Sequence, residues 1–318
     1  MLESPPSPPN VARPPGTVLR WYVRMPLKSA AFALVTFFVL FPYPRQFARH
    51  VEHLRNMQTL VEPDAPQLDR LQTLLDERLR PIAATQPALL QSPPLVQRHV
   101  ERFVLEQVHY EWDWNLWGSA DYMPTVAEVF EKADEAGGEL REDCDGRAII
   151  AASLMKRLGY DATLVTDLRH VWVSTPQGEW MGPGRDKTLI ATPEGTRVDW
   201  GTVVSNIPVS LSYGIGVFPF WREVIILVTA FGLSLHRRMS RRAAAIGLIL
   251  LIQGLLYMRL GYLAPYAVSR EVSSWPAWVG LVHVAAGFAI LWRASSRARH
   301  LVTHAGALPL AVTGPESH

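Results

Sequence analysis

The stretch DCDGRAIIAASLMKRLGYDATLV, residues 143–165, carries the one cysteine of the chain and reads as a helix followed by a strand. Ile150, Leu154 and Leu158 recur at helical spacing, and Gly159 is a typical residue at which a helix stops. Asp143 stands where an N-cap is preferred, so Cys144 should be the first residue of the helix. The segment YDATLVTD that follows is typical of a short strand.

Further strands are expected downstream and helices upstream of this segment. RHVWVST and EWMG flank the turn PQG, and KTLIAT and TRVDW suggest two more strands. Helical spacing recurs upstream, at residues 45–60, 66–80, 95–110 and from Thr125 onward. The expected fold class is therefore α+β, with helices first and an antiparallel sheet last.

Cys144 and His170 are the candidate catalytic pair. At the start of a helix the unpaired N–H groups favour an anion, which lowers the pKa of a thiol. Glu142, Asp143 and Asp145 oppose this, less so if Asp143 caps the helix and Asp145 points to solvent or to another partner. His170 opens the second expected strand after the helix, where alternation puts it on the same face as Trp172. A cationic imidazole there would favour the thiolate form of Cys144.

These residues resemble the transglutaminase-like superfamily of papain-like cysteine enzymes. The resemblance covers about residues 100–200 and rests on DCDGRAIIAASLMKRLGYDATLV, RHVWVS and GEW, with DYMPTVAEVF similar to bacterial transglutaminase-like cysteine peptidases. It implies a nucleophilic Cys144, a basic His170 and an orienting acid on the following strand. The chain departs from the family pattern after Trp180, where Pro183 and Gly184 occupy the expected place. Asp186 is the best match for the acid and Asp199 the second.

The resemblance implies attack of Cys144 on a carboxamide or peptide carbonyl through a thioester. Water as acceptor makes a peptidase or amidase, which the look of the bacterial members favours, whereas a lysine amine makes a cross-linking acyltransferase. The main rival is a non-catalytic binding module of the same fold, and a weaker one makes the membrane spans a sensor. No cofactor or metal is expected. Calcium could bind Glu142, Asp143 and Asp145, but capping and solvation explain them more simply.

Four apolar runs are near the length of about 20 residues that a membrane-spanning helix needs, at about 27–44, 218–236, 243–264 and 275–292. No small-residue cleavage site follows the first run, which favours an uncleaved anchor over a signal peptide. Arg259, near the outer end of the third run, could extend to the interface.

The charges give these spans an orientation. Residues 45–218 hold 17 Lys and Arg against 25 Asp and Glu, a net charge of −8, and the rest of the chain has a net charge of +10. Eleven of the 14 basic residues outside 45–218 precede the first run, separate the second from the third or follow the fourth. The positive-inside rule places these segments in the cytoplasm.

The expected organisation follows from these spans. It is a Pro-rich cytoplasmic tail, a transmembrane anchor, an extracytoplasmic transglutaminase-like domain, three transmembrane helices and a cytoplasmic tail, at 1–26, 27–44, 45–217, 218–292 and 293–318. We expect a multi-pass protein of the cytoplasmic (inner) membrane with the domain on its periplasmic face. The expected partners are the lipid bilayer and a protein or peptide substrate, and an acidic domain argues against nucleic acid.

Overall fold

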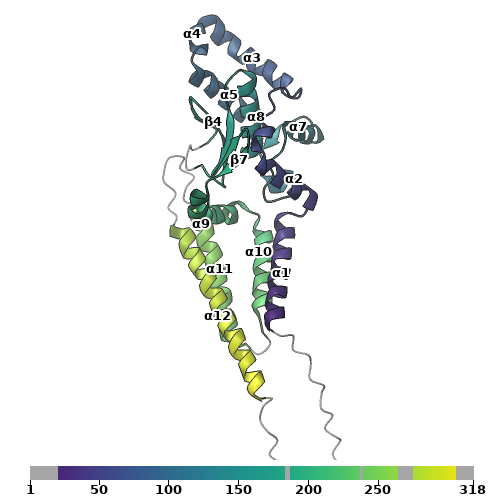
Figure 1. Ribbon diagram of the computed structural model, residues 1–318, viewed down its shortest axis with the longest axis vertical. Helices are drawn as coiled ribbons and strands as arrows, with labels where there is room; N and C mark the ends of the chain where they lie inside the picture. Colours follow the sequence, from purple (N-terminus) through teal and green to yellow (C-terminus); the bar gives the residue numbers. More distant parts are fainter. Residues whose placement is uncertain (1–20, 183–186, 237–238, 264–274, 306–318) are drawn as a thin grey trace, which may run out of the picture.

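The computed structural model describes residues 21–182, 187–236, 239–263 and 275–305, and it shows an α+β domain on one end of a helical bundle (Figure 1). The α+β class expected from the sequence is confirmed.

Helices form the first part of the domain. They are α2 (Pro44–Arg55), the 3-10 helix η1 (Met57–Leu60), α3 (Leu68–Thr85), α4 (Pro87–Leu90), α5 (Pro93–Gln107), α6 (Asp113–Leu116) and α7 (Val126–Glu135). The start of α7 is set by a capping box, in which Thr125 and Glu128 satisfy each other's backbone N–H groups. The aromatic segment after α5 contains only α6 and the two-residue strand β1 (His109–Tyr110), which pairs with β2 (Arg141–Glu142).

The second part of the domain is a five-stranded antiparallel sheet. Its strands are β3 (Thr163–Thr166), β4 (Val171–Thr175), β5 (Gly178–Trp180), β6 (Leu189–Thr192) and β7 (Gly195–Val198), in the spatial order β5-β4-β3-β6-β7. The expected strands are therefore present. Val173 pairs with Trp180 across the β4–β5 hairpin, and Val165 pairs with Trp172 across β3–β4.

Helix α8 (Cys144–Arg157) is the centre of the domain core. It packs against β3 and β4 and against α5, so it is buried on more than one side and needs no polar face. Ala148, Ala151 and Ala152 are fully buried, and their small side chains let the neighbouring elements approach closely. The helix ends as expected, because Gly159 takes a φ of 88°.

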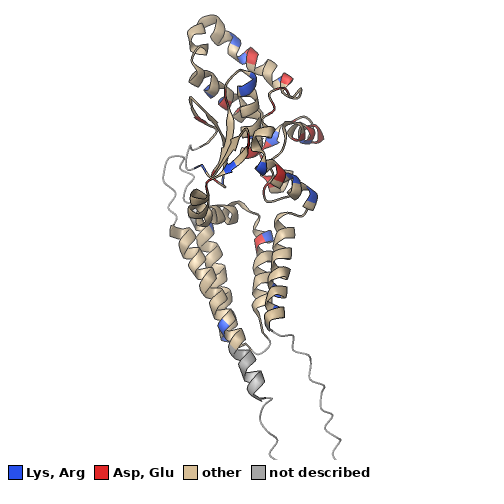
Figure 2. Ribbon diagram, viewed as in Figure 1, with Lys and Arg blue, Asp and Glu red and all other residues tan. Residues whose placement is uncertain are grey.

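The bundle consists of α1 (Trp21–Leu40), α10 (Phe220–Ser234), α11 (Arg241–Leu263) and α12 (Trp275–Ala305), with few charged residues compared with the domain (Figure 2). Three helices are long and apolar enough to cross a membrane, over Tyr22–Leu40, Arg241–Leu260 and Trp275–Ser296. The first ends earlier than the predicted 44, because Pro42 and Pro44 cannot continue a helix.

The predicted span at 218–236 takes a different form. Helix α10 has only 15 residues, and it qualifies as a span only together with α9 (Trp200–Val217), from which it is bent by 118°. The bend lies at Phe218–Pro219, next to the predicted domain boundary at 217. Helix α9 is an apolar helix that the sequence patterns did not anticipate, and it packs against α11 and α12. It lies across the end of the bundle, beneath the domain (Figure 1).

Hydrogen bonds tie the domain to the bundle. The backbone N–H of Ala120 donates to the carbonyl of Leu40 in α1, at 2.8 Å. Arg222 of α10 donates through two nitrogens to the carbonyl of Gly118, at 3.2 and 3.1 Å. Arg259 pairs with Glu223 at 3.0 Å and donates to the carbonyl of Phe218 at 2.8 Å, at the bend between α9 and α10.

Candidate active site

Cys144 is the first residue of α8, as the sequence predicted. Asp143 is the N-cap, and its Oδ1 accepts the backbone N–H of Asp145 at 3.0 Å. Because α8 packs into the core, its first turn is buried as well, and Cys144 is only 8% exposed. The cap and the packing together hold the thiol at the end of the domain that faces the bundle.

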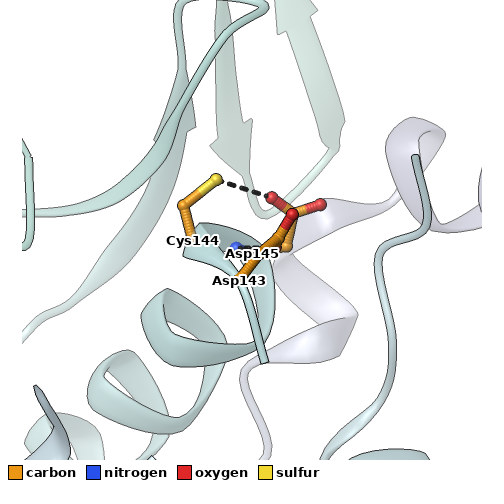
Figure 3. Close-up of side chains that lie close together, drawn as sticks. All are labelled: Asp143, Cys144 and Asp145. Atoms are coloured by element: carbon orange, nitrogen blue, oxygen red, sulfur yellow. Dashed lines mark hydrogen bonds between the residues drawn. The ribbon is translucent and has the colours of Figure 1, made fainter. Parts of the chain in front are cut away.

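The thiol is neutral at rest, which differs from the expected thiolate. Its Sγ donates to Oδ1 of Asp145 at 3.2 Å, so Asp145 turns toward the sulfur (Figure 3). Burial raises the pKa of Cys144 well above its usual value, and the carboxylates of Asp143 and Asp145 raise it further. The backbone N–H of Val171 works in the other direction but is outweighed. Desolvation disfavours the charged thiolate more than the helix terminus favours it.

His170 is placed by the turn between β3 and β4. Oδ1 of Asp167 accepts the backbone N–H groups of Arg169 and His170, both at 3.0 Å. Leu168 takes a φ of 69°, the left-handed conformation that such a tight turn requires. The imidazole then stacks on Trp172 with ring centroids 6.5 Å apart, so the two side chains lie on the same side as predicted, although His170 precedes β4 and does not open it.

A backbone carbonyl orients the imidazole. Nε2 of His170 lies 2.8 Å from the carbonyl oxygen of Met181. A carbonyl can only accept, so Nε2 carries the proton and Nδ1 has the lone pair that a general base needs. Met181 is itself held by its N–H, which donates to Oε1 of Glu101 at 2.8 Å. Burial lowers the pKa of His170, although the bond to Met181 opposes this, so the imidazole is neutral at pH 7.

The two predicted acids stand differently. Asp186 lies outside the described residues. Asp199 is exposed and caps α9, accepting the N–H of Thr202 at 3.2 Å. Two strands, β3 and β6, separate β7 from the β4 strand that follows His170. Within the described residues the acceptor that orients His170 is therefore the Met181 carbonyl. The chain passes beside His170 at Gly182, where a Cβ would lie 3.1 Å from the imidazole.

A cluster of buried carboxyl groups lies behind the thiol, and its member Asp113 was missed from sequence. Asp113 and Glu142 are 2% and 0% exposed, and one oxygen of each has no hydrogen-bond partner among the described residues. Burial is the main cause that raises the pKa of each of the four carboxyl groups, those of Asp113, Glu142, Asp143 and Asp145. The pKa of Asp143 is raised to about 7. These groups therefore hold protons that ordinary carboxyls would lose.

The same carboxyl groups are close enough to hold a metal ion. Ligand oxygens of Asp113, Glu142 and Asp143, and those of Asp113, Asp121 and Asp145, lie within 4.8 Å of one another. Hard cations such as Ca²⁺ prefer oxygen ligands of this kind. Only the carboxylates next to Cys144 could be identified from sequence, since Asp113 is about 30 residues upstream and shows no ligand spacing with them.

Cys144 and His170 line one cavity of about 540 Å³ at the junction of domain and bundle. No hydrogen bond between the two side chains occurs in the described part of the chain, because the thiol bonds Asp145 and Nε2 of the imidazole bonds Met181. The cavity gives a substrate access to both groups. The arrangement thus places a thiol and an oriented imidazole on the wall of one pocket.

Comparisons of the chain with protein-family models, with curated proteins and with solved structures found no match.

Proposed function

We propose that the protein is a membrane-anchored cysteine enzyme of transglutaminase-like type, a peptidase or amidase acting on an envelope protein or peptide. The observation that carries this proposal is the shared cavity. Cys144 and His170 both line it, and the Met181 carbonyl orients the imidazole of His170. The resemblance of the residues around Cys144 to bacterial transglutaminase-like peptidases supports hydrolysis over cross-linking.

The reaction begins with a neutral thiol. Cys144 leaves Asp145 and attacks the substrate carbonyl, while its proton passes to Nδ1 of His170. The backbone N–H of Cys144 stabilises the oxyanion. The imidazolium then gives its proton to the leaving amine, and a thioester remains on Cys144. Water, deprotonated by His170, attacks the thioester and releases a carboxylic acid and the thiol.

The membrane placement is part of the proposal. It puts the domain outside the cytoplasmic membrane and both chain ends in the cytoplasm. It is supported by the start of α1 and the end of α12, which lie together at the end of the bundle away from the domain (Figure 1). Reporter fusions after residues 120, 240 and 316 test it. An external signal at 240 would overturn the placement.

A second candidate function is a non-catalytic binding module that recruits an envelope protein or peptide. The observation that favours it is the bond of the thiol to Asp145, with a pKa well above that of an ordinary cysteine. Such a thiol reacts slowly unless His170 takes its proton.

Labelling of the single cysteine distinguishes the two candidates. We expect an iodoacetamide probe to label the full chain at neutral pH and Cys144→Ser not at all. A general base contributes at least about a hundredfold to a reaction rate. His170→Ala should therefore slow labelling by tenfold or more, even if only part of that contribution applies to iodoacetamide. His99→Ala, far from the cavity, is the matched control. Equal rates for His170→Ala and His99→Ala would favour the binding module.

A further inference from the structure

The cavity at Cys144 has two different walls. The domain contributes Cys144 and His170, whereas α1, α9, α10 and α11 contribute apolar side chains, among them Leu40, Leu211, Ile226, Leu227 and Leu255. These helices include two of the three that are long and apolar enough to cross a membrane. The reactive groups therefore border a space that is walled by the membrane part of the molecule.

The volume of about 540 Å³ is within the usual range for pockets that bind small ligands. An apolar wall of this extent suits a hydrocarbon chain, because moving CH₂ groups out of water and against apolar side chains is favourable. Gly214 leaves additional room, since a Cβ there would meet no atom within 4 Å.

Polar atoms interrupt the apolar wall. Three polar residues, Thr36, Ser210 and Glu223, are among those that line the cavity. One side-chain oxygen of each (Oγ1, Oγ and Oε1) is buried and has no hydrogen-bond partner among the described residues. The other oxygen of Glu223 is held by Arg259. The residues that carry these atoms make the lining of the cavity less uniformly apolar at three places.

We propose that the cavity binds a lipid-acylated peptide, with the acyl chain between α9, α10 and α11 and the adjoining amide at Cys144. This deepens the proposed function and rests on it, because it names the class of substrate on which the thiol acts. The acyl chain enters from the bilayer, and the peptide part lies toward the domain, where Cys144 and His170 line the cavity.

Two glycines provide a matched test. Both are exposed, and a Cβ at either meets nothing within 4 Å, but Gly214 of α9 lines the cavity whereas Gly232 of α10 lies outside it. The full chain in phosphatidylcholine nanodiscs is labelled with N-hexadecyl iodoacetamide and with N-methyl iodoacetamide. We expect the ratio of the two rates to fall at least fivefold in Gly214→Leu and to keep the parental value in Gly232→Leu. Partition of the long reagent into lipid is the same for both variants, so it cancels.

A ratio that is equal in the two variants would overturn the acyl-chain proposal while leaving the cysteine enzyme intact. Absence of labelling of the parent by the short reagent would instead overturn the proposed function.

A binding measurement decides the acyl chain without any reaction at the thiol. In Cys144→Ser, a peptide carrying a diazirine-labelled hexadecanoyl chain should cross-link within 210–227 or at Leu255 of α11, and its unlabelled analogue should compete. The N-acetyl analogue of the same peptide should not compete. Cross-links confined to other segments, or equal competition by the acetyl peptide, would contradict the proposal.

Discussion

At the scale of single residues, Cys144 and His170 differ from the charged pair that the sequence suggested. Cys144 is buried and His170 is partly buried, and desolvation disfavours the charged form of each, so the pKa of the thiol is raised and that of the imidazole is lowered. The resting site is therefore a neutral thiol beside a neutral base. In the proposed reaction, the proton therefore leaves the thiol during the attack and not before it.

This neutral pair predicts the pH dependence of labelling. His170 accepts a proton only while it is unprotonated, so the rate should fall on acidification through a pKa below 6.5. The raised pKa of Cys144 keeps its thiol protonated where an ordinary cysteine ionises, so no rise in rate is expected there. The measurement is the iodoacetamide rate from pH 4 to 10, with His170→Ala as control. A rate that stays constant down to pH 4 would indicate a preformed thiolate and contradict this account.

Glu101 should act on the site only through Met181. Removing its carboxylate in Glu101→Ala frees the Met181 peptide and weakens the bond that orients His170. A hydrogen bond of about 1 kcal/mol corresponds to roughly a fivefold slower labelling rate. The bond to Met181 raises the pKa of His170, so its loss should also shift the acidic limb of the pH profile downward.

Glu101→Gln keeps an acceptor oxygen at the same place and should restore both the rate and the profile. A slower rate with an unmoved profile in Glu101→Ala would mean that the residue only supports the fold.

At the scale of elements, the start of α8 is built over protonated acids. Asp113, which belongs to α6, approaches the N-terminal turn of α8 so closely that the carboxyl groups of both elements cannot all ionise. The native state therefore holds more protons than the unfolded chain between pH 4 and 7, given the pKa of about 7 for Asp143. Under that condition stability falls as pH rises.

We expect unfolding of the solubilised protein, followed by tryptophan fluorescence, to occur at lower temperature at pH 8 than at pH 5. Each unit of pKa corresponds to about 1.4 kcal/mol, so a few kcal/mol are at stake. Asp113→Asn removes one acid and keeps an oxygen for the N–H of Tyr122. This variant should lose much of the difference between the two pH values. The same difference in parent and variant would show that the cluster does not govern stability.

At the scale of the whole molecule, the domain and the bundle share the cavity and are tied together by few polar contacts. Arg222 is central among them, because its guanidinium donates twice to Gly118 in the loop that leads to Tyr122. The same arginine lies over the rings of Phe218 and Trp221. The bend between α9 and α10 is thus attached directly to the domain.

Loss of this attachment should be measurable. Arg222→Ala should increase amide hydrogen exchange in residues 116–123 severalfold, because the Gly118 carbonyl loses both donors. Val228→Ala is the control, since this side chain of α10 is 61% exposed and donates nothing to Gly118. Unchanged exchange in Arg222→Ala would show that the hydrogen bond from Ala120 to Leu40 holds the junction alone.

Local features of the sequence were sufficient for much of this fold. The cap at Asp143, the stop at Gly159, the capping box at Thr125 and the alternation of His170 with Trp172 each depend on residues a few positions apart. Interactions within one turn or one hairpin are encoded in short windows, which is why they can be predicted. The three long apolar helices follow from composition in the same way.

Only the tertiary structure decided what surrounds the thiol. Asp145 turns to the sulfur and not to solvent, Met181 supplies the acceptor beside His170, and Asp113 joins the acids from about 30 residues away. The apolar wall of the cavity comes from α9 and α10, whose 118° bend no periodicity predicts. Packing of distant segments sets burial, and burial sets the charge of Cys144 and His170, so the protonation state of the site could not be obtained from neighbouring residues alone.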